Sequence, residues 1–306
     1  MPSGCNWLVA DSEESGRCFS CRLSRRLPDR TDTIAWEKLK DTGIAKRRLL
    51  MQLMQLMQPK LLIIPFSERE GGLGFDLLSS FSGQRVSIGH ANGIITIDPA
   101  ETLDAYRESL RVRLGEPYRT MPGHFRHEIG RYYPGVLLTD DEQWDACRAL
   151  VGDERASYRD AISRHYKEDA AENWAESFIS EYATMHSWED FAESFAHYLH
   201  ISGTLATASA AGVIVSAERV AGIIDHDIVP QHSYGELGGD RMLEDWRWLS
   251  LMLNRVNRTM GPGDLYPFTL TDPVKAKLRF VHEIMVPRSQ LGSRSFETAA
   301  RAPGGQ

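Results

Sequence analysis

The 306-residue chain is poor in cysteine, in long apolar runs and in positive charge, and each shortage excludes a class of protein. Its 35 Lys and Arg residues are outnumbered by 42 Asp and Glu residues, which argues against a surface devoted to nucleic acid. The least charged long stretch, residues 204–217, is shorter than the roughly 20 apolar residues that a membrane span requires. The first residues lack the basic and apolar regions of a secretory signal, so we expect a cytoplasmic protein.

The few cysteines are unevenly placed. Cys5, Cys18 and Cys21 lie within the first 21 residues, whereas Cys147 stands alone in a predicted helix. In a chain without a secretory signal, such a cluster is more typical of a metal site than of a disulfide framework. We therefore expect Cys5, Cys18 and Cys21 to hold a structural metal, with free thiols on a frayed segment as the alternative.

Composition and pattern predict an α+β protein that is mainly helical. The apolar fraction of 42% and the charged fraction of 25% are those of a globular chain with a substantial core. Three parts are expected: a small Cys-containing module at residues 1–32, a main domain at 33–288, and a disordered tail at 289–306 that is rich in Ser, Arg, Gly and Pro.

The main domain shows one clear β signal among helical patterns. Alternating apolar residues on either side of Asn92-Gly93 predict a β-hairpin over residues 85–98. Apolar residues at intervals of three and four predict one or two amphipathic helices over 34–57. Further helices are predicted at about 98–114, 123–133, 140–150, 154–165, 173–184, 188–201, 235–256 and 273–283.

The chemistry of the chain is concentrated in two segments. His127-Glu128 is the first half of an H-E-x-x-H signature, in which two histidines on one helix face bind zinc and the glutamate acts as general base. Arg131 occupies the place of the second histidine. A permanent cation without a lone pair cannot bind a metal ion.

A later segment supplies carboxylates at helical spacing. Glu189 and Glu193 are four residues apart and share one face of a predicted helix. We expect Glu189 to be a metal ligand from this second helix and Glu193 to orient His127. The alternative interpretation is a half-exposed amphipathic helix whose glutamates face water.

Several longer segments together resemble a known family. CNWLV, CFSCRL, GHFRHEIGRYY, YATMHSWEDFAE and AHYLH occur in this order at residues 5–9, 18–23, 123–133, 182–193 and 196–200. They are similar to segments of gluzincin-like zinc metallopeptidases that carry an amino-terminal zinc-ribbon-like segment. The resemblance implies a zincin-like core and hydrolysis of peptide or protein substrates by a zinc-activated water, with Glu128 as base.

The resemblance also implies roles for two further regions. In gluzincins of the lethal-factor type, a tyrosine lies seven residues before the ligand glutamate, and Tyr182 has this relation to Glu189. Tyr182 would then stabilise the oxyanion of the tetrahedral intermediate; a core tyrosine is the alternative. By the same resemblance, Ile94–Ile97 is expected to be an edge strand that binds extended substrate.

Two departures from the family bear on function. Arg131 leaves His127 and Glu189 one nitrogen ligand short, and we expect its guanidinium to pair with Glu189 or Glu128; His124 is the alternative ligand. At the amino terminus, the family's further upstream cysteine has no counterpart before Cys5, so the fourth ligand there is expected to be borrowed or water.

Three functional classes follow from these patterns. The first is a zinc peptidase whose activity is impaired by Arg131, and the second is a pseudopeptidase that binds peptide or protein without cutting it. The third is a nucleic-acid-binding protein that uses the basic residues around Cys18 and Cys21, which the acidic net charge of −7 disfavours. No nucleic-acid or membrane partner is expected, and metal content separates the first two classes.

Overall fold

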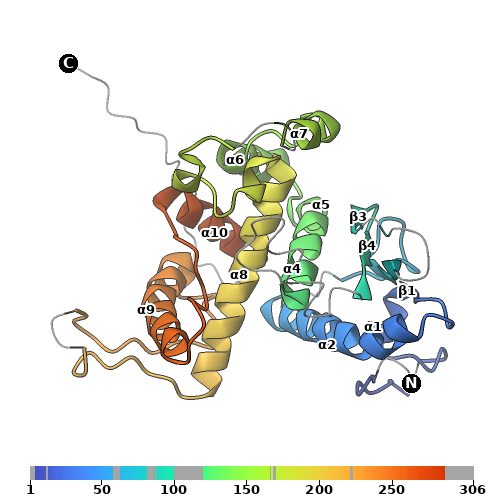
Figure 1. Cartoon of the computed structure of the whole chain (residues 1–306), viewed down its shortest axis with the longest axis horizontal. Coiled ribbons are helices and arrows are strands. Elements are labelled where there is room, and N and C mark those ends of the chain that lie inside the picture. The colour runs from blue at the N-terminus through green and yellow to red at the C-terminus, as the bar shows by residue number, and fades with distance from the viewer. Residues whose placement is uncertain are drawn as a thin grey trace.

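A computed structural model describes residues 4–286 with the exception of residues 12, 58–62, 81–85, 87, 100–119, 166, 168–169 and 221–222 (Figure 1). Within this part, the chain has a mainly helical α+β fold, and its small sheet lies at one side of the molecule (Figure 1). None of the helices in the described ranges is long and apolar enough to cross a membrane.

The sheet has four short strands in the order β1-β2-β4-β3. These strands are β1 (Ser24–Arg26), β2 (Gly74–Leu77), β3 (Gly89–Ala91) and β4 (Ile94–Ile97). Strand β2 is parallel to both β1 and β4, whereas β3 is antiparallel to β4.

The predicted hairpin is confirmed by β3 and β4. Its turn has Asn92 at φ 48° and Gly93 at φ 82°, the left-handed conformations that a two-residue Asn-Gly turn requires. The prediction that Ile94–Ile97 is the edge strand is wrong, because β4 pairs on one side with β2 and on the other with β3. Among the described strands, β3 is the one at this edge.

The helices follow the periodic segments closely. They are α1 (Phe19–Arg22), α2 (Thr33–Leu56), α4 (Met121–Tyr132), α5 (Pro134–Leu137), α6 (Asp141–Val151), α7 (Tyr158–His165), α8 (Ser187–Ala210), α9 (Gly238–Thr259) and α10 (Asp272–Met285). Helix α2 is a single helix whose first turn is capped by Asp32, which accepts from Ala35 N at 2.9 Å. The helix predicted over 98–114 and the tail at 289–306 lie mostly or wholly outside the described residues.

One helix prediction is wrong. Residues 173–184 form two short 3₁₀ turns, η3 (Trp174–Glu176) and η4 (Tyr182–Thr184), with irregular backbone between them. Polar groups of this segment form other bonds: Ser177 O accepts from the distant Lys277 Nζ at 2.7 Å, and Ser180 Oγ accepts locally from Ala183 N at 3.2 Å. Such bonds offer the backbone an alternative to a regular helix.

Helix α8 is the centre of the molecule. Figure 1 shows it between α4 on one side and α9 and α10 on the other. The closest approach to α4 is at Gly130, where a Cβ atom would lie 2.9 Å from both the Cα and the carbonyl oxygen of Ala192. Next to this point Tyr133 stacks on Phe195, with ring centroids 5.2 Å apart. This contact fixes the rotation of α4 against α8 and therefore the side chains that meet between them.

Candidate active site between α4 and α8

The close contact of α4 and α8 brings the two chemistry-bearing segments together. His127 Nε2 lies 2.9 Å from Glu189 Oε2, and His127 Nδ1 lies 2.7 Å from Glu193 Oε1. All three side chains are largely buried, and Glu189 has no exposed surface. The four-residue spacing on α8 thus places both carboxylates against one imidazole. The described hydrogen bonds of His127 and Glu189 do not include His124.

Arg131 lies one turn beyond His127 and faces the same carboxylates. Its NH1 group is 3.4 Å from Glu189 Oε1 and 4.0 Å from Glu128 Oε2. The guanidinium also packs over the ring of Tyr158, 5.2 Å from the centroid. These contacts hold a positive charge beside the buried Glu189 carboxylate, at the helix position where the zinc signature has a histidine.

Two residues that support this network were missed by sequence reasoning. Tyr158, the first residue of α7, donates to Glu189 Oε1 at 2.6 Å, and Ser180 donates to Glu193 Oε2 at 2.8 Å. Tyr158 belongs to no motif, and Ser180 falls in a segment predicted as helix. No signal in a single sequence connects either residue to the carboxylate that it contacts.

Tyr182 lies at the border of the same network. Its ring contacts those of His127 and His165, each with centroids 5.8 Å apart. Burial and the neighbouring Glu189 carboxylate raise the pKa of Tyr182 above its usual value. Tyr182 is therefore a neutral hydroxyl beside the ion pair.

The titration behaviour of the central pair reflects these contacts. Burial alone would lower the pKa of His127, but its hydrogen bonds to Glu189 and Glu193 outweigh burial and raise this pKa well above its usual value. Burial opposes ionisation of Glu193 too, yet the hydrogen bond and charge of His127 lower the pKa of Glu193 to about 2. At neutral pH His127 is thus an imidazolium between the carboxylates of Glu189 and Glu193.

A catalytic zinc ion needs three protein ligands and one open position. In this site the lone pairs of Glu189 are used by His127, Tyr158 and Arg131. Both nitrogens of His127 face carboxylates. A guanidinium next to the metal position adds repulsion, because arginine stays charged. The residues present therefore do not fit a three-ligand zinc site.

The amino-terminal cysteines do fit a metal. Cys5 Sγ and Cys18 Sγ are 3.4 Å apart, and the sulfurs of Cys5, Cys18 and Cys21 all lie within 4.8 Å of one another. Zinc–sulfur bonds of about 2.3 Å in a tetrahedron separate ligand sulfurs by roughly 3.8 Å. The three thiols thus have the separations that one zinc ion requires, and the cluster could hold a metal.

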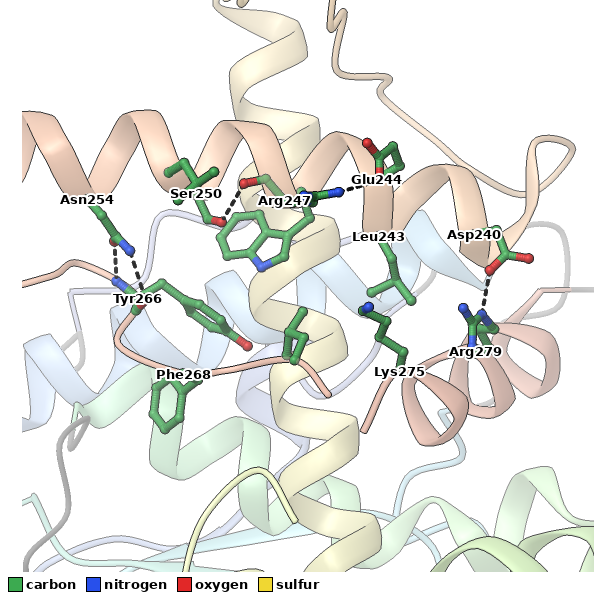
Figure 2. A pocket seen from close by; sticks show the side chains of 13 residues that line it. Asp240, Leu243, Glu244, Arg247, Ser250, Asn254, Tyr266, Phe268, Lys275 and Arg279 are labelled. Carbon is green, nitrogen blue, oxygen red and sulfur yellow. Dashed lines mark hydrogen bonds and ion pairs between the residues drawn. The ribbon is translucent and has the colours of Figure 1, made fainter. Parts of the chain in front are cut away.

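A separate groove of about 740 Å³ lies between α9, residues 266–270 and the first turns of α10 (Figure 2). None of the expected site residues lines it. Its link to α8 is a 2.8 Å hydrogen bond between Tyr266 and His197. The charged side chains around it pair with one another, as Arg279 does with Asp240.

A His-Glu pair on one helix that faces glutamates of a second helix is the residue set of a metallopeptidase scaffold, here with an arginine in place of one histidine. The chain belongs to the family described as "Putative zinc-binding metallo-peptidase", which matches residues 34–284.

Relatives in Mycobacterium bovis and in two strains of Mycobacterium tuberculosis are each 41% identical to the chain over 282 residues. The alignment covers 92% of this chain and 79% of each relative, and each relative is described as an uncharacterized protein. No solved structure matches the chain.

Proposed function

We propose that this chain binds extended peptides at the α4–α8 site and does not hydrolyse them while Arg131 is present. The observation that carries the proposal is the contact of Arg131 NH1 with Glu189 Oε1 at 3.4 Å. On this proposal, the chain keeps a zincin-like scaffold, and the Arg131 guanidinium takes the place of the metal ion as a fixed cation.

The charge beside Glu128 disfavours hydrolysis. Glu128 would act as general base on a metal-bound water in a working peptidase. Here the cation beside Glu128 Oε2 is the Arg131 guanidinium at 4.0 Å, which has no open position for a water nucleophile of lowered pKa. Without such a nucleophile, the barrier to peptide hydrolysis is not lowered by the usual route.

Strand β3 supports peptide binding. This short strand lies at the edge of the described sheet, and a Cβ atom at Gly89 would be 3.9 Å from Arg131 NH1. The ring of His90 packs edge-on against Tyr132 of α4, with centroids 5.8 Å apart. A peptide that adds to β3 as a further strand would therefore run beside Arg131 and the carboxylates.

A second candidate is a zinc peptidase of reduced activity, in which Glu128 is the base and Tyr182 supports the oxyanion. One observation favours it: His127 Nε2 and Glu189 Oε2 are 2.9 Å apart, close enough to share one ion. This function requires Arg131 to leave the carboxylates and a third ligand to take its place.

Metal content and peptide protection test the proposal together. We expect a Cys5→Ser, Cys18→Ser variant, which lacks the thiol cluster, to contain essentially no zinc by elemental analysis. We expect no release of fluorescein from labelled casein. Unlabelled casein peptides should slow amide hydrogen exchange in the segment that contains residues 88–97, as an added strand would. Stoichiometric zinc in that variant, with hydrolysis that Glu128→Gln abolishes, would refute the proposal in favour of the peptidase.

A further inference from the structure

Lys46 on α2 is a buried cation without a described anionic partner. Only 3% of the residue is exposed, and Nζ donates to Ser20 O at 2.8 Å and to Ser24 Oγ at 2.5 Å. The ammonium also lies 5.4 Å from the centre of the Phe75 ring. Among the described residues, no carboxylate lies within ion-pair distance of Lys46. A buried ammonium of this kind is strongly disfavoured unless an anion compensates it.

The groups next to Lys46 are the amino-terminal cysteines. Ser20, whose carbonyl accepts from Lys46, lies between Cys18 and Cys21 on α1. Burial lowers the pKa of Lys46 to about 8; the neighbouring sulfurs of Cys21 and Cys18 raise this pKa, and the nearby arginines lower it. Lys46 thus fixes the turn that carries two of the three thiols and places its charge near them.

The neighbouring residue on α2 serves the third thiol. Arg47 is 7% exposed. Its NH2 group donates at 3.2 Å to the carbonyl oxygen of Gly4, the residue before Cys5. Two consecutive cationic side chains of α2 therefore contact the two separate segments that meet at the cysteine cluster.

The net charge of a metal ion bound by the three cysteines indicates the role of Lys46. Cysteines bind zinc as thiolates, so a divalent ion with three thiolates has a net charge of −1. We propose that Lys46 is the counter-cation and positioning residue of a metal–thiolate centre formed by Cys5, Cys18 and Cys21. Lys46 offsets the net charge of this centre and holds α1 in the conformation that brings Cys18 and Cys21 together. The proposal does not depend on the function of the α4–α8 site.

A substitution that removes the charge but keeps a hydrogen-bond donor separates this role from simple packing. In Lys46→Gln, zinc affinity measured by competition with a chromophoric chelator should fall roughly ten- to a hundredfold, the usual effect of losing a partner outside the ligand set. The thiolate-to-cobalt charge-transfer band near the ultraviolet should weaken at equal Co²⁺ concentration. Lys46→Arg should keep most of the affinity, and Lys38→Met, on the same helix and paired with Glu37, should keep all of it.

Stability with and without metal gives the second readout. Replacing a buried, uncompensated ammonium by an apolar group is neutral or stabilising. Lys46→Met should therefore leave the chelator-treated protein as stable as the wild type or more so, and should destabilise the zinc-loaded protein relative to wild type. A purely structural lysine would instead lower both stabilities equally.

Three results would overturn the proposal. The first is a Cys5→Ser, Cys18→Ser variant that binds zinc and Co²⁺ as the wild type does. The second is wild-type affinity for zinc in Lys46→Gln. The third is an equal loss of stability by Lys46→Met in the zinc-loaded and chelator-treated states. If Lys46→Met does not fold, the affinity of Lys46→Gln decides.

Discussion

Arginine and histidine at position 131 differ in two properties that matter here. Histidine offers a lone pair to a metal, whereas arginine offers only N–H donors and a fixed charge. In this chain the guanidinium lies beside two glutamates, 3.4 Å from Glu189 and 4.0 Å from Glu128. A side chain of the chain itself thus supplies positive charge beside these carboxylates, where the zinc signature would have a metal ligand.

We predict that Arg131→His converts the site into a metal site. His127, the introduced histidine and Glu189 would then supply three ligands, with Glu193 bonded to His127 as it is now. The variant should bind one more zinc per chain than the wild type by elemental analysis. It should also release fluorescein from labelled casein at a measurable rate.

The control for this prediction is a second substitution in the same variant. Glu128→Gln should lower the rate of casein hydrolysis at least about 100-fold, because general-base catalysis typically contributes that much. It should leave the extra zinc in place. Arg131→Lys should gain neither zinc nor activity, since it keeps the positive charge. An inactive Arg131→His protein that holds the extra zinc would show that more than this residue has been lost.

The His127 ion pair predicts a pH dependence of stability. The raised pKa of His127 stabilises the fold fully below its unfolded value near 6.5, and this contribution is lost as pH rises toward the folded pKa. The pKa of Glu193, lowered to about 2 from 4.5, adds stability above pH 4.5 that is lost as pH falls toward 2. The pair therefore stabilises most between about pH 4.5 and 6.5.

This dependence is measurable by urea unfolding at a series of pH values. Above pH 6.5 the His127 contribution should fall by at most about 1.4 kcal/mol per pH unit, the value for one proton. His127→Gln should remove this slope, whatever its effect on the absolute free energy of unfolding. Equal slopes in wild type and variant would mean that His127 is not protonated in the folded protein.

Spacing on α4 and α8 was enough to bring His127, Glu189 and Glu193 to one place, because helix periodicity relates sequence distance directly to side-chain direction. The roles of Tyr158 and Ser180 could not be predicted in this way. Each reaches the site from an irregular or short segment, whose position is decided by long-range contacts that leave no local pattern.

At the scale of elements, the interface of α4 and α8 depends on one residue without a side chain. A Cβ at Gly130 would meet Ala192 backbone atoms at 2.9 Å, closer than Cβ atoms approach in proteins, and Phe195 Cβ at 3.1 Å, which is tighter than usual. We predict that Gly130→Ala lowers the free energy of unfolding by about 1–3 kcal/mol, although alanine favours helices. Urea denaturation measures this loss.

The matched control lies in the next helix. A Cβ at Gly135 of α5 would meet nothing within 4 Å, so Gly135→Ala should leave stability unchanged or raise it by up to about 1 kcal/mol. If both substitutions have the same effect, helix propensity and not the interhelical contact governs position 130.

Elements with strong local signals were predicted correctly, whereas the segment at 173–184 was not. The hairpin has its Asn92-Gly93 turn, and α2, α6 and α10 each begin at a side-chain cap. The residues at 173–184 are compatible with a helix, but the backbone carbonyl of Ser177 accepts a hydrogen bond from Lys277, which is 100 positions away in the sequence. Tertiary contacts of this range override local propensity and cannot be read from one sequence.

At the scale of the whole molecule, a buried ion pair connects α10 to α8. Lys277 Nζ lies 2.6 Å from Asp190 Oδ2, and the two side chains are 5% and 1% exposed. We predict that Lys277→Met costs about 3–5 kcal/mol of stability, because it leaves a buried carboxylate without its partner. Lys275→Met, which breaks only the exposed pair with Asp272, should cost less than about 0.5 kcal/mol. Thermal unfolding of the two variants checks both values.

Strand β1 joins the amino-terminal segment to the sheet. Phe75 N donates to Leu23 O at 2.7 Å, and Arg25 forms two hydrogen bonds with the buried Asp76 of β2.

The family match begins only at residue 34, after this strand. A chain truncated to residues 34–286 would therefore expose the edge of β2, which is buried throughout, as a template for intermolecular pairing. We predict that light scattering finds this truncated chain as oligomers and the chain from residue 4 as a smaller species. The segment that the family match covers would then be too short to fold without self-association.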